Sequence, residues 1–121
     1  MARTRERGEL TPFVKTLEGR GETHLPLLTE GVARRMRAGM VTLGPGEDCG
    51  RHSTEDYEEL LIILEGRGEA ELEGHGAFAL EAGEAVYIPP HIYHNILSRG
   101  DGDLRYVYVV APAALAEAGD P

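Results

Sequence analysis

The feature that most constrains the fold is the run of five aliphatic residues at positions 60–64, LLIIL. It is far shorter than the ~20 apolar residues of a membrane helix, and a run of this length is typical of a buried β-strand. Alternate residues of a strand face opposite sides, so Leu61 shares a face with Glu59, and Leu60 points the other way. Both faces are apolar and need cover. One face can line the inside of a barrel. The other must be covered by the N-terminal segment or by a second subunit, so we predict a homodimer.

Short stretches with strand character recur along residues 34–112. Turns rich in glycine or proline, such as residues 44–46, 66–68 and 89–90, separate these stretches at intervals of ~8–12 residues, and no long helical period is present. This pattern predicts a single all-β domain, a sandwich or barrel, over residues 34–112.

The flanking segments carry weaker patterns. Residues 1–33 are predicted to form an N-terminal segment that packs across the barrel or a dimer partner, with an edge strand at 13–17 and an irregular covering stretch at 25–28. Residues 113–121 are predicted to form a C-terminal tail, in which residues 113–118 could make one helical turn.

Charge and composition argue against several classes of function. The net charge is −9, so the chain lacks the basic surface with which proteins neutralise nucleic-acid phosphates. The single cysteine, Cys49, excludes an internal disulfide. Residues 1–10 lack the apolar core of a signal peptide, and no segment is long and apolar enough for a membrane helix. We therefore predict a cytoplasmic protein with no nucleic-acid or membrane partner.

Side chains that commonly bind metals flank the apolar strand. His52 and Glu59 precede it, and His94 lies in a later stretch, where it shares a face with Ile92 and Ile96. Imidazole and carboxylate groups bind Fe, Mn, Zn, Ni and Cu. Two histidines and one carboxylate inside an apolar barrel leave coordination positions open for water or substrate, as in many non-haem iron sites. The sequence thus predicts a divalent transition-metal site.

The spacing of these residues resembles the two signatures of the cupin superfamily. The first signature is matched by Gly46, His52, Thr54, Glu59 and Gly66, and the second by Gly83, Pro89 and His94. The resemblance spans about half of the chain. It implies a small single-domain cupin, a jelly-roll-like β-barrel of two antiparallel sheets with little helix.

The resemblance also implies which residues bind the metal. Cupins usually use two histidines and a glutamate from the first signature and a histidine from the second, which implies His52, Glu59 and His94 here. Thr54 stands at the position of the second histidine, so the site has three protein ligands. This departure lowers the expected affinity and admits a metal-free member. His91 also departs from the family pattern, because it replaces a glycine.

Other residues near the motifs have more than one interpretation. Thr54, Tyr57 and His91 are predicted to line a substrate pocket, where Thr54 could orient a bound water. Glu58 is the alternative inward carboxylate if the strand register shifts by one residue. Cys49 is either a small buried residue or a thiolate near the site.

Further histidines and tyrosines are assigned to surface and packing positions. His24 and His75 lie in loop-like surroundings and are predicted to be surface residues, whereas Tyr106 and Tyr108 are predicted to pack.

Two functions are compatible with the sequence. The first is a metal-dependent enzyme of the dioxygenase, decarboxylase or isomerase type that acts on a small polar substrate. The alternative is a non-catalytic barrel that binds a sugar or another small molecule without a catalytic metal. The sequence does not distinguish among the dioxygenase, decarboxylase and isomerase reactions.

Overall fold

A computed structural model of the chain describes residues 10–18 and 22–114. This part of the chain contains no helix, as the all-β prediction requires, and its strands are β1 (His24–Leu28), β2 (Arg37–Leu43), β3 (His52–Ser53), β4 (Tyr57–Glu65), β5 (Arg67–Leu72), β6 (Gly76–Glu81), β7 (Ala85–Ile88), β8 (Tyr93–Ser98) and β9 (Leu104–Pro112). The described residues accordingly include no helix long and apolar enough to cross a membrane.

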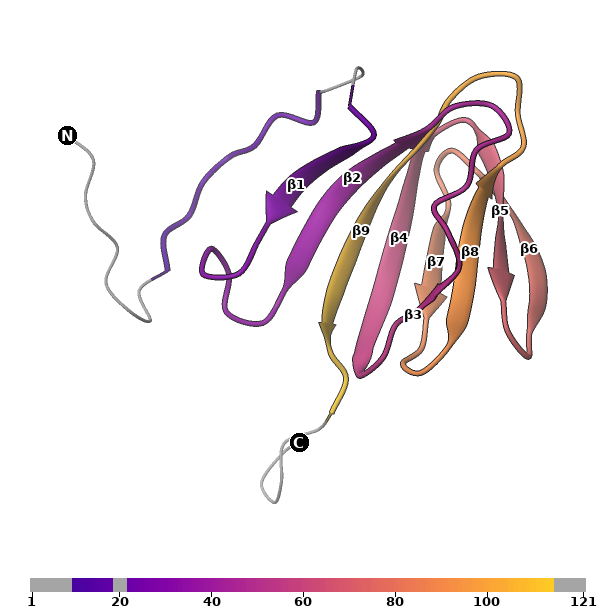
Figure 1. Ribbon diagram of the computed structural model, residues 1–121. Helices are drawn as coiled ribbons and strands as arrows, with labels where there is room; N and C mark the ends of the chain where they lie inside the picture. Colours follow the sequence, from indigo (N-terminus) through magenta and orange to yellow (C-terminus); the bar gives the residue numbers. More distant parts are fainter. Residues whose placement is uncertain (1–9, 19–21, 115–121) are drawn as a thin grey trace.

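The strands form two antiparallel sheets that face each other (Figure 1). One has the order β1-β2-β9-β4-β7, and the other has the order β3-β8-β5-β6. Consecutive strands β4 and β5 belong to different sheets, so the chain crosses between the sheets at Gly66. The predicted jelly-roll-like architecture is confirmed.

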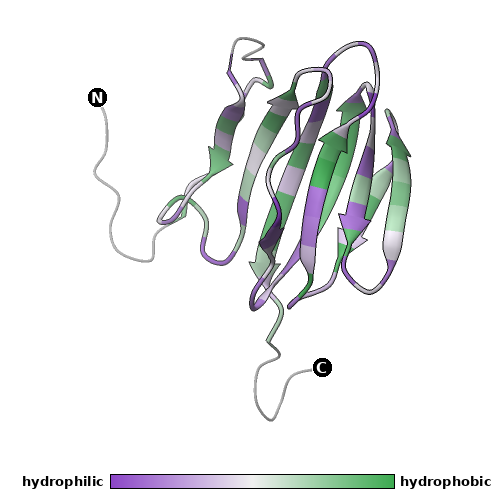
Figure 2. Cartoon of the chain, turned by 45° about the vertical axis from the view of Figure 1, so that its right-hand side comes forward, coloured by the Kyte–Doolittle hydropathy of each residue, from purple (hydrophilic) through white to green (hydrophobic). Residues whose placement is uncertain are grey.

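The core lies between the two sheets. Strands carry most of the hydrophobic residues, whereas many of the connecting turns are hydrophilic (Figure 2). The buried cluster consists of Leu43, Leu61, Ile63, Ala70, Leu72, Leu80, Ile88, Ile96, Leu104 and Tyr106. Both sheets contribute to it, so apolar burial holds them together.

Strand β4 shows the alternation that its sequence predicts. Glu59, Leu61 and Ile63 are buried, and Glu58 lies on the outer face, where it accepts a hydrogen bond of 2.7 Å from the Tyr87 hydroxyl. The outward side chains are 40%, 39% and 40% exposed at Leu60, Ile62 and Leu64. The register therefore makes Glu59, and not Glu58, the inward carboxylate.

The N-terminal expectations need two corrections. Residues 10–18 form no strand, so the edge strand predicted at 13–17 is wrong. The irregular stretch predicted at 25–28 is also wrong, because β1 lies there and pairs with β2. Pro26 argues against a central strand, but β1 is an edge strand, where a residue without an N–H is tolerated.

The segment 10–18 is hydrogen-bonded to the outer face of the larger sheet. The buried guanidinium of Arg105 donates to the backbone oxygen of Leu17 and to Glu65 Oε1, at 3.3 and 3.4 Å. Residues 1–9, and residues 115–118 of the predicted helical turn, lie outside the described residues. The proposed division at residues 33/34 and 112/113 remains a prediction.

Candidate metal centre and cavity

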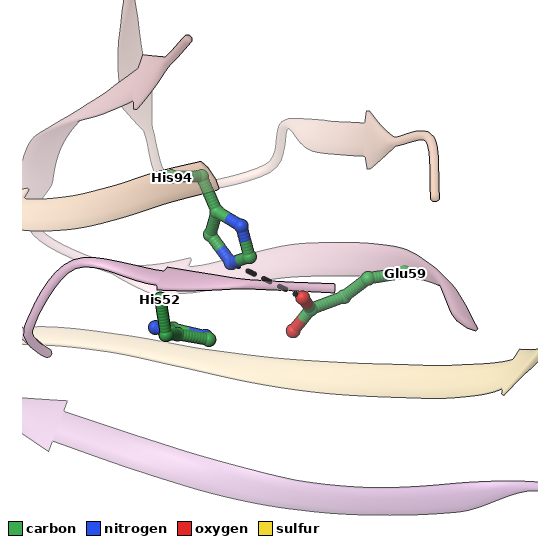
Figure 3. Close-up of side chains that lie close together, drawn as sticks. All are labelled: His52, Glu59 and His94. Atoms are coloured by element: carbon green, nitrogen blue, oxygen red, sulfur yellow. Dashed lines mark ion pairs between the residues drawn. The ribbon is translucent and has the colours of Figure 1, made fainter. Parts of the chain in front are cut away.

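His52, Glu59 and His94 converge between the two sheets (Figure 3). One ligand atom from each of them lies within 4.8 Å of the other two. His52 on β3 and His94 on β8 are direct cross-strand partners, with ring centroids 4.2 Å apart. Glu59 approaches from β4 in the opposite sheet. The strand pairing therefore brings together three residues that are distant in sequence.

Backbone carbonyls orient both imidazole rings. Nδ1 of His52 lies 2.8 Å from the Gly50 oxygen, and Nδ1 of His94 lies 3.2 Å from the Ile92 oxygen. A carbonyl oxygen only accepts, so each Nδ1 carries the proton and donates it. In the neutral ring Nε2 then holds the free lone pair, which is the arrangement that metal-binding histidines use.

The side chain of Glu59 is buried. Glu59 is 9% exposed and His94 is 2% exposed, and His94 Nε2 lies 3.3 Å from Glu59 Oε1. An ionised carboxylate removed from water needs a compensating charge. A cation between Glu59 and the two imidazoles would provide it.

The donor set fits a divalent transition metal. Bonds of about 2.0–2.2 Å from one ion to nitrogen or oxygen place two of its ligands at most about 4.4 Å apart. The three donor atoms already lie within 4.8 Å of one another, so small side-chain movements suffice. Two imidazoles and one carboxylate also match the preferences of these ions.

The surroundings of His52 favour the protonated form of its imidazole. A side-chain hydrogen bond with Cys49 is the main cause that raises the pKa of His52 to about 9, helped by the Gly50 carbonyl and by the charges of Cys49 and Glu59, while burial acts in the opposite direction. A metal ion at Nε2 must displace this proton, so binding should release it.

A cavity of about 460 Å³ adjoins the three residues. One side is formed by the inner face of β2, β9 and β4, and the other carries His52, His94 and Ile96. Its size is within the range of sites for small organic ligands. The arrangement can hold an ion with open positions facing a largely apolar cavity.

The predicted pocket residues have different placements. Tyr57 lines the cavity. Thr54 also lines it, but its hydroxyl donates to the Pro89 oxygen at 2.9 Å and accepts from the Ile92 nitrogen at 3.2 Å. These bonds tie β3 to the turn before β8, which gives Thr54 a structural role.

His91 is outside the residues that line the cavity. It adopts a left-handed conformation with φ of 62°, and its exposed Nε2 lies 3.2 Å from Asp56 Oδ1. The turn therefore directs the ring toward Asp56 at the surface. The structure does not bring His91 to the three donor residues.

Several of the residues that line the cavity were not predicted from the sequence. His24 is exposed, as predicted, and it also lines the cavity together with Arg37, Tyr106 and Tyr108. His75 is likewise exposed, as predicted, and lies outside the cavity lining. Cys49 is half-buried, lines the cavity and accepts a 3.4 Å hydrogen bond from the Ile96 nitrogen. The alternation of residues in β2 could have shown that Arg37 faces the cavity. The position of His24 could be known only from the pairing of β1 with β2.

Comparison with known proteins shows a similarity to the cupin family. A family model described as the cupin domain matches residues 39–110. The chain is 33% identical over 76 residues to the polyketide synthase CurC of Streptomyces cyaneus, covering 63% of this chain and 49% of that protein. It is 32% identical over 80 residues to an uncharacterized protein of Methanocaldococcus jannaschii, covering 66% and 62%. The chain thus spans about half to three-fifths of these relatives.

Solved structures share the fold. A protein of Bacillus halodurans aligns with a TM-score of 0.75 and 22% identity, over 88% of this chain and 85% of that one. A "predicted oxalate decarboxylase" of Thermotoga maritima aligns with a TM-score of 0.68 and 26% identity, over 74% and 78%. The first likeness shows the arrangement of strands alone.

Proposed function

The chain belongs to the cupin family, and from this we propose that it binds one divalent transition-metal ion through His52, Glu59 and His94. The observation that supports the proposal is the convergence of the three donor atoms within 4.8 Å, with both Nδ1 atoms held by backbone carbonyls. The adjoining cavity would hold a small polar substrate. The proposed activity is that of a metal-dependent enzyme of the dioxygenase, decarboxylase or isomerase type.

A bound ion would supply a Lewis acid or a redox centre at the edge of the cavity. The chain would supply orientation. Hydrogen bonds to Gly50 and Ile92 fix the two rings, and the cavity walls would position the substrate beside them. Tyr57 would contact the substrate from the cavity wall.

One feature favours the non-catalytic alternative. Thr54 replaces a histidine of the family pattern, and its hydroxyl already bonds to the backbone at Pro89 and Ile92. With three protein ligands, the ion is held less tightly than by four. A barrel that binds a small molecule without a catalytic metal is therefore the second candidate.

Metal titration distinguishes the two candidates. We expect metal-free protein to bind one Mn²⁺, Fe²⁺ or Zn²⁺ ion per chain in isothermal titration calorimetry. Elemental analysis of untagged protein should show the same stoichiometry. Protein that binds none of these ions would contradict the metal proposal and leave the small-molecule barrel.

We also propose that the outer face of the larger sheet joins two copies of the chain. Across this face, Leu60 is paired with Val109 and with Tyr87, and Ile62 is paired with Val107. Leu60, Ile62 and Tyr87 are 40%, 39% and 55% exposed. Contiguous exposed apolar side chains on several strands are typical of interaction surfaces.

Light scattering coupled to size-exclusion chromatography tests this proposal. The protein should elute with about twice the chain mass of 13.2 kDa. The double variant Leu60→Glu and Ile62→Glu should shift the mass to that of one chain, because two charges would be buried at the interface. Ala77→Glu, at an exposed position of β6 in the other sheet, should leave it unchanged. Wild-type protein with the mass of one chain would contradict the proposal.

A further inference from the structure

The cavity contains a second polar group of residues besides the three donors. The register of the larger sheet places Arg37, Val110 and Glu59 at adjacent positions on β2, β9 and β4. Arg37 and Glu59 are thus two strands apart, and a strand spacing of about 4.8 Å puts their backbones roughly 10 Å from each other. A small molecule can span this distance.

Arg37 offers a cation to the cavity. Its guanidinium lies over the Tyr57 ring, 4.6 Å from the ring centroid. No ion pair among the described residues includes Arg37, although the chain carries a net charge of −9. A planar guanidinium held by an aromatic ring is suited to bind a carboxylate with two parallel hydrogen bonds.

His24 and Tyr108 form a hydrogen-bonded pair next to Arg37. His24 Nε2 lies 2.7 Å from the Tyr108 hydroxyl, and their rings stack with centroids 5.7 Å apart. Tyr108 is paired with Gly39, two residues along β2 from Arg37, so it shares the inner face with Arg37. The pair therefore places a hydroxyl on the cavity wall beside the guanidinium.

Gly39 makes this pair possible. His24 and Tyr108 belong to β1 and β9, which are separated by β2. A Cβ at position 39 would lie 2.7 Å from both His24 Nε2 and the Tyr108 hydroxyl, closer than atoms pack. A side chain at position 39 would push the imidazole and the hydroxyl aside, so Gly39 leaves the room in which they meet over β2.

The phenol remains a donor in this setting. Burial and the charge of Glu59 raise the pKa of Tyr108, and Arg37 offsets part of this effect. The neutral hydroxyl can donate to an anion in the cavity if His24 donates to its oxygen. The guanidinium of Arg37 and the hydroxyl of Tyr108 can then donate hydrogen bonds to the same anionic group.

We propose that Arg37, Tyr108 and His24 form an anion subsite, so that the cavity takes a small organic carboxylate. Its carboxylate would lie on Arg37 and Tyr108, and its other end would face His52, Glu59 and His94. That the other end of the ligand faces these three residues rests on the proposed metal function, whereas the anion subsite itself needs no metal. The apolar wall residues Val41, Leu61 and Val110 suit an apolar body between the two ends.

Benzoate and benzamide test the subsite because they share a shape and differ in charge. Calorimetric titration of the full chain, zinc-loaded and metal-free, should show benzoate binding at least tenfold more tightly than benzamide. Arg37→Gln should remove this preference. Tyr108→Phe should weaken benzoate binding several-fold, and Gly39→Ala should do the same by displacing the His24–Tyr108 pair.

Arg67→Gln is the matched control, because Arg67 is an exposed arginine of the other sheet. It should leave benzoate binding unchanged. The subsite is overturned if benzoate does not bind saturably, if benzamide binds equally well, or if Arg37→Gln retains the preference. Benzoate binding that depends on Arg37 in a protein that binds no zinc would overturn the metal proposal alone.

Discussion

His52→Ala is expected to lower the affinity for Mn²⁺, Fe²⁺ or Zn²⁺ by at least about 100-fold, since loss of even an indirect partner of a metal ligand costs ~10–100-fold. His52 is one of three donors within 4.8 Å of one another, so its loss leaves two. The side chain is exposed, and its removal creates no cavity in the core. Calorimetric titration measures the affinity, and urea unfolding should show that the variant still folds cooperatively.

Two further variants make this result specific. Glu59→Gln keeps the shape of a buried side chain and removes its charge, so it should also abolish tight metal binding. His91→Ala is the matched control, because His91 is an exposed histidine outside the cavity lining. Its affinity should equal that of the wild type. Undiminished affinity in His52→Ala would show that the metal binds elsewhere.

The parts of the site that the sequence could predict depend on local periodicity. Residue alternation placed Glu59 with Leu61 and Ile63, and the buried face of β4 carries these three residues. His94 was similarly placed with Ile96 in β8, and both are buried. A strand that is apolar on its inner face permits only one register, so the direction of each side chain follows from its position.

The anion subsite could not be predicted because it depends on pairing between distant strands. His24 and Tyr108 are 84 residues apart and meet across Gly39. The sequence predicted an irregular stretch at residues 25–28, where β1 lies. Only the β1–β2 register shows that the missing side chain makes room for an imidazole.

His91 shows the limit of spacing arguments in turns. It is three residues from His94, and the sequence therefore suggested a place in the pocket. Its positive φ and its contact with Asp56 direct the ring away. In a strand, position determines the face, whereas in a turn the direction of a side chain depends on backbone angles that spacing does not reveal.

Gly66→Ala is expected to destabilise the fold by about 3 kcal/mol or more. Gly66 has φ of +86°, and left-handed backbone costs an L-residue roughly 1–2 kcal/mol. An added Cβ would also collide with the backbone carbonyl of Asp103 and lie 3.1 Å from the Leu104 Cα. These are backbone atoms at the crossing between the sheets, so they cannot rotate aside.

Gly83→Ala separates the two contributions. Gly83 has φ of +93°, but a Cβ there would meet nothing within 4 Å, so only the backbone cost of about 1 kcal/mol should appear. Urea unfolding at one fixed protein concentration measures both variants against the wild type. Equal losses would mean that the contact with Asp103 relaxes and that backbone conformation alone requires glycine. A much larger loss in Gly66→Ala would show that the close approach of Asp103 makes glycine necessary where β4 passes into β5.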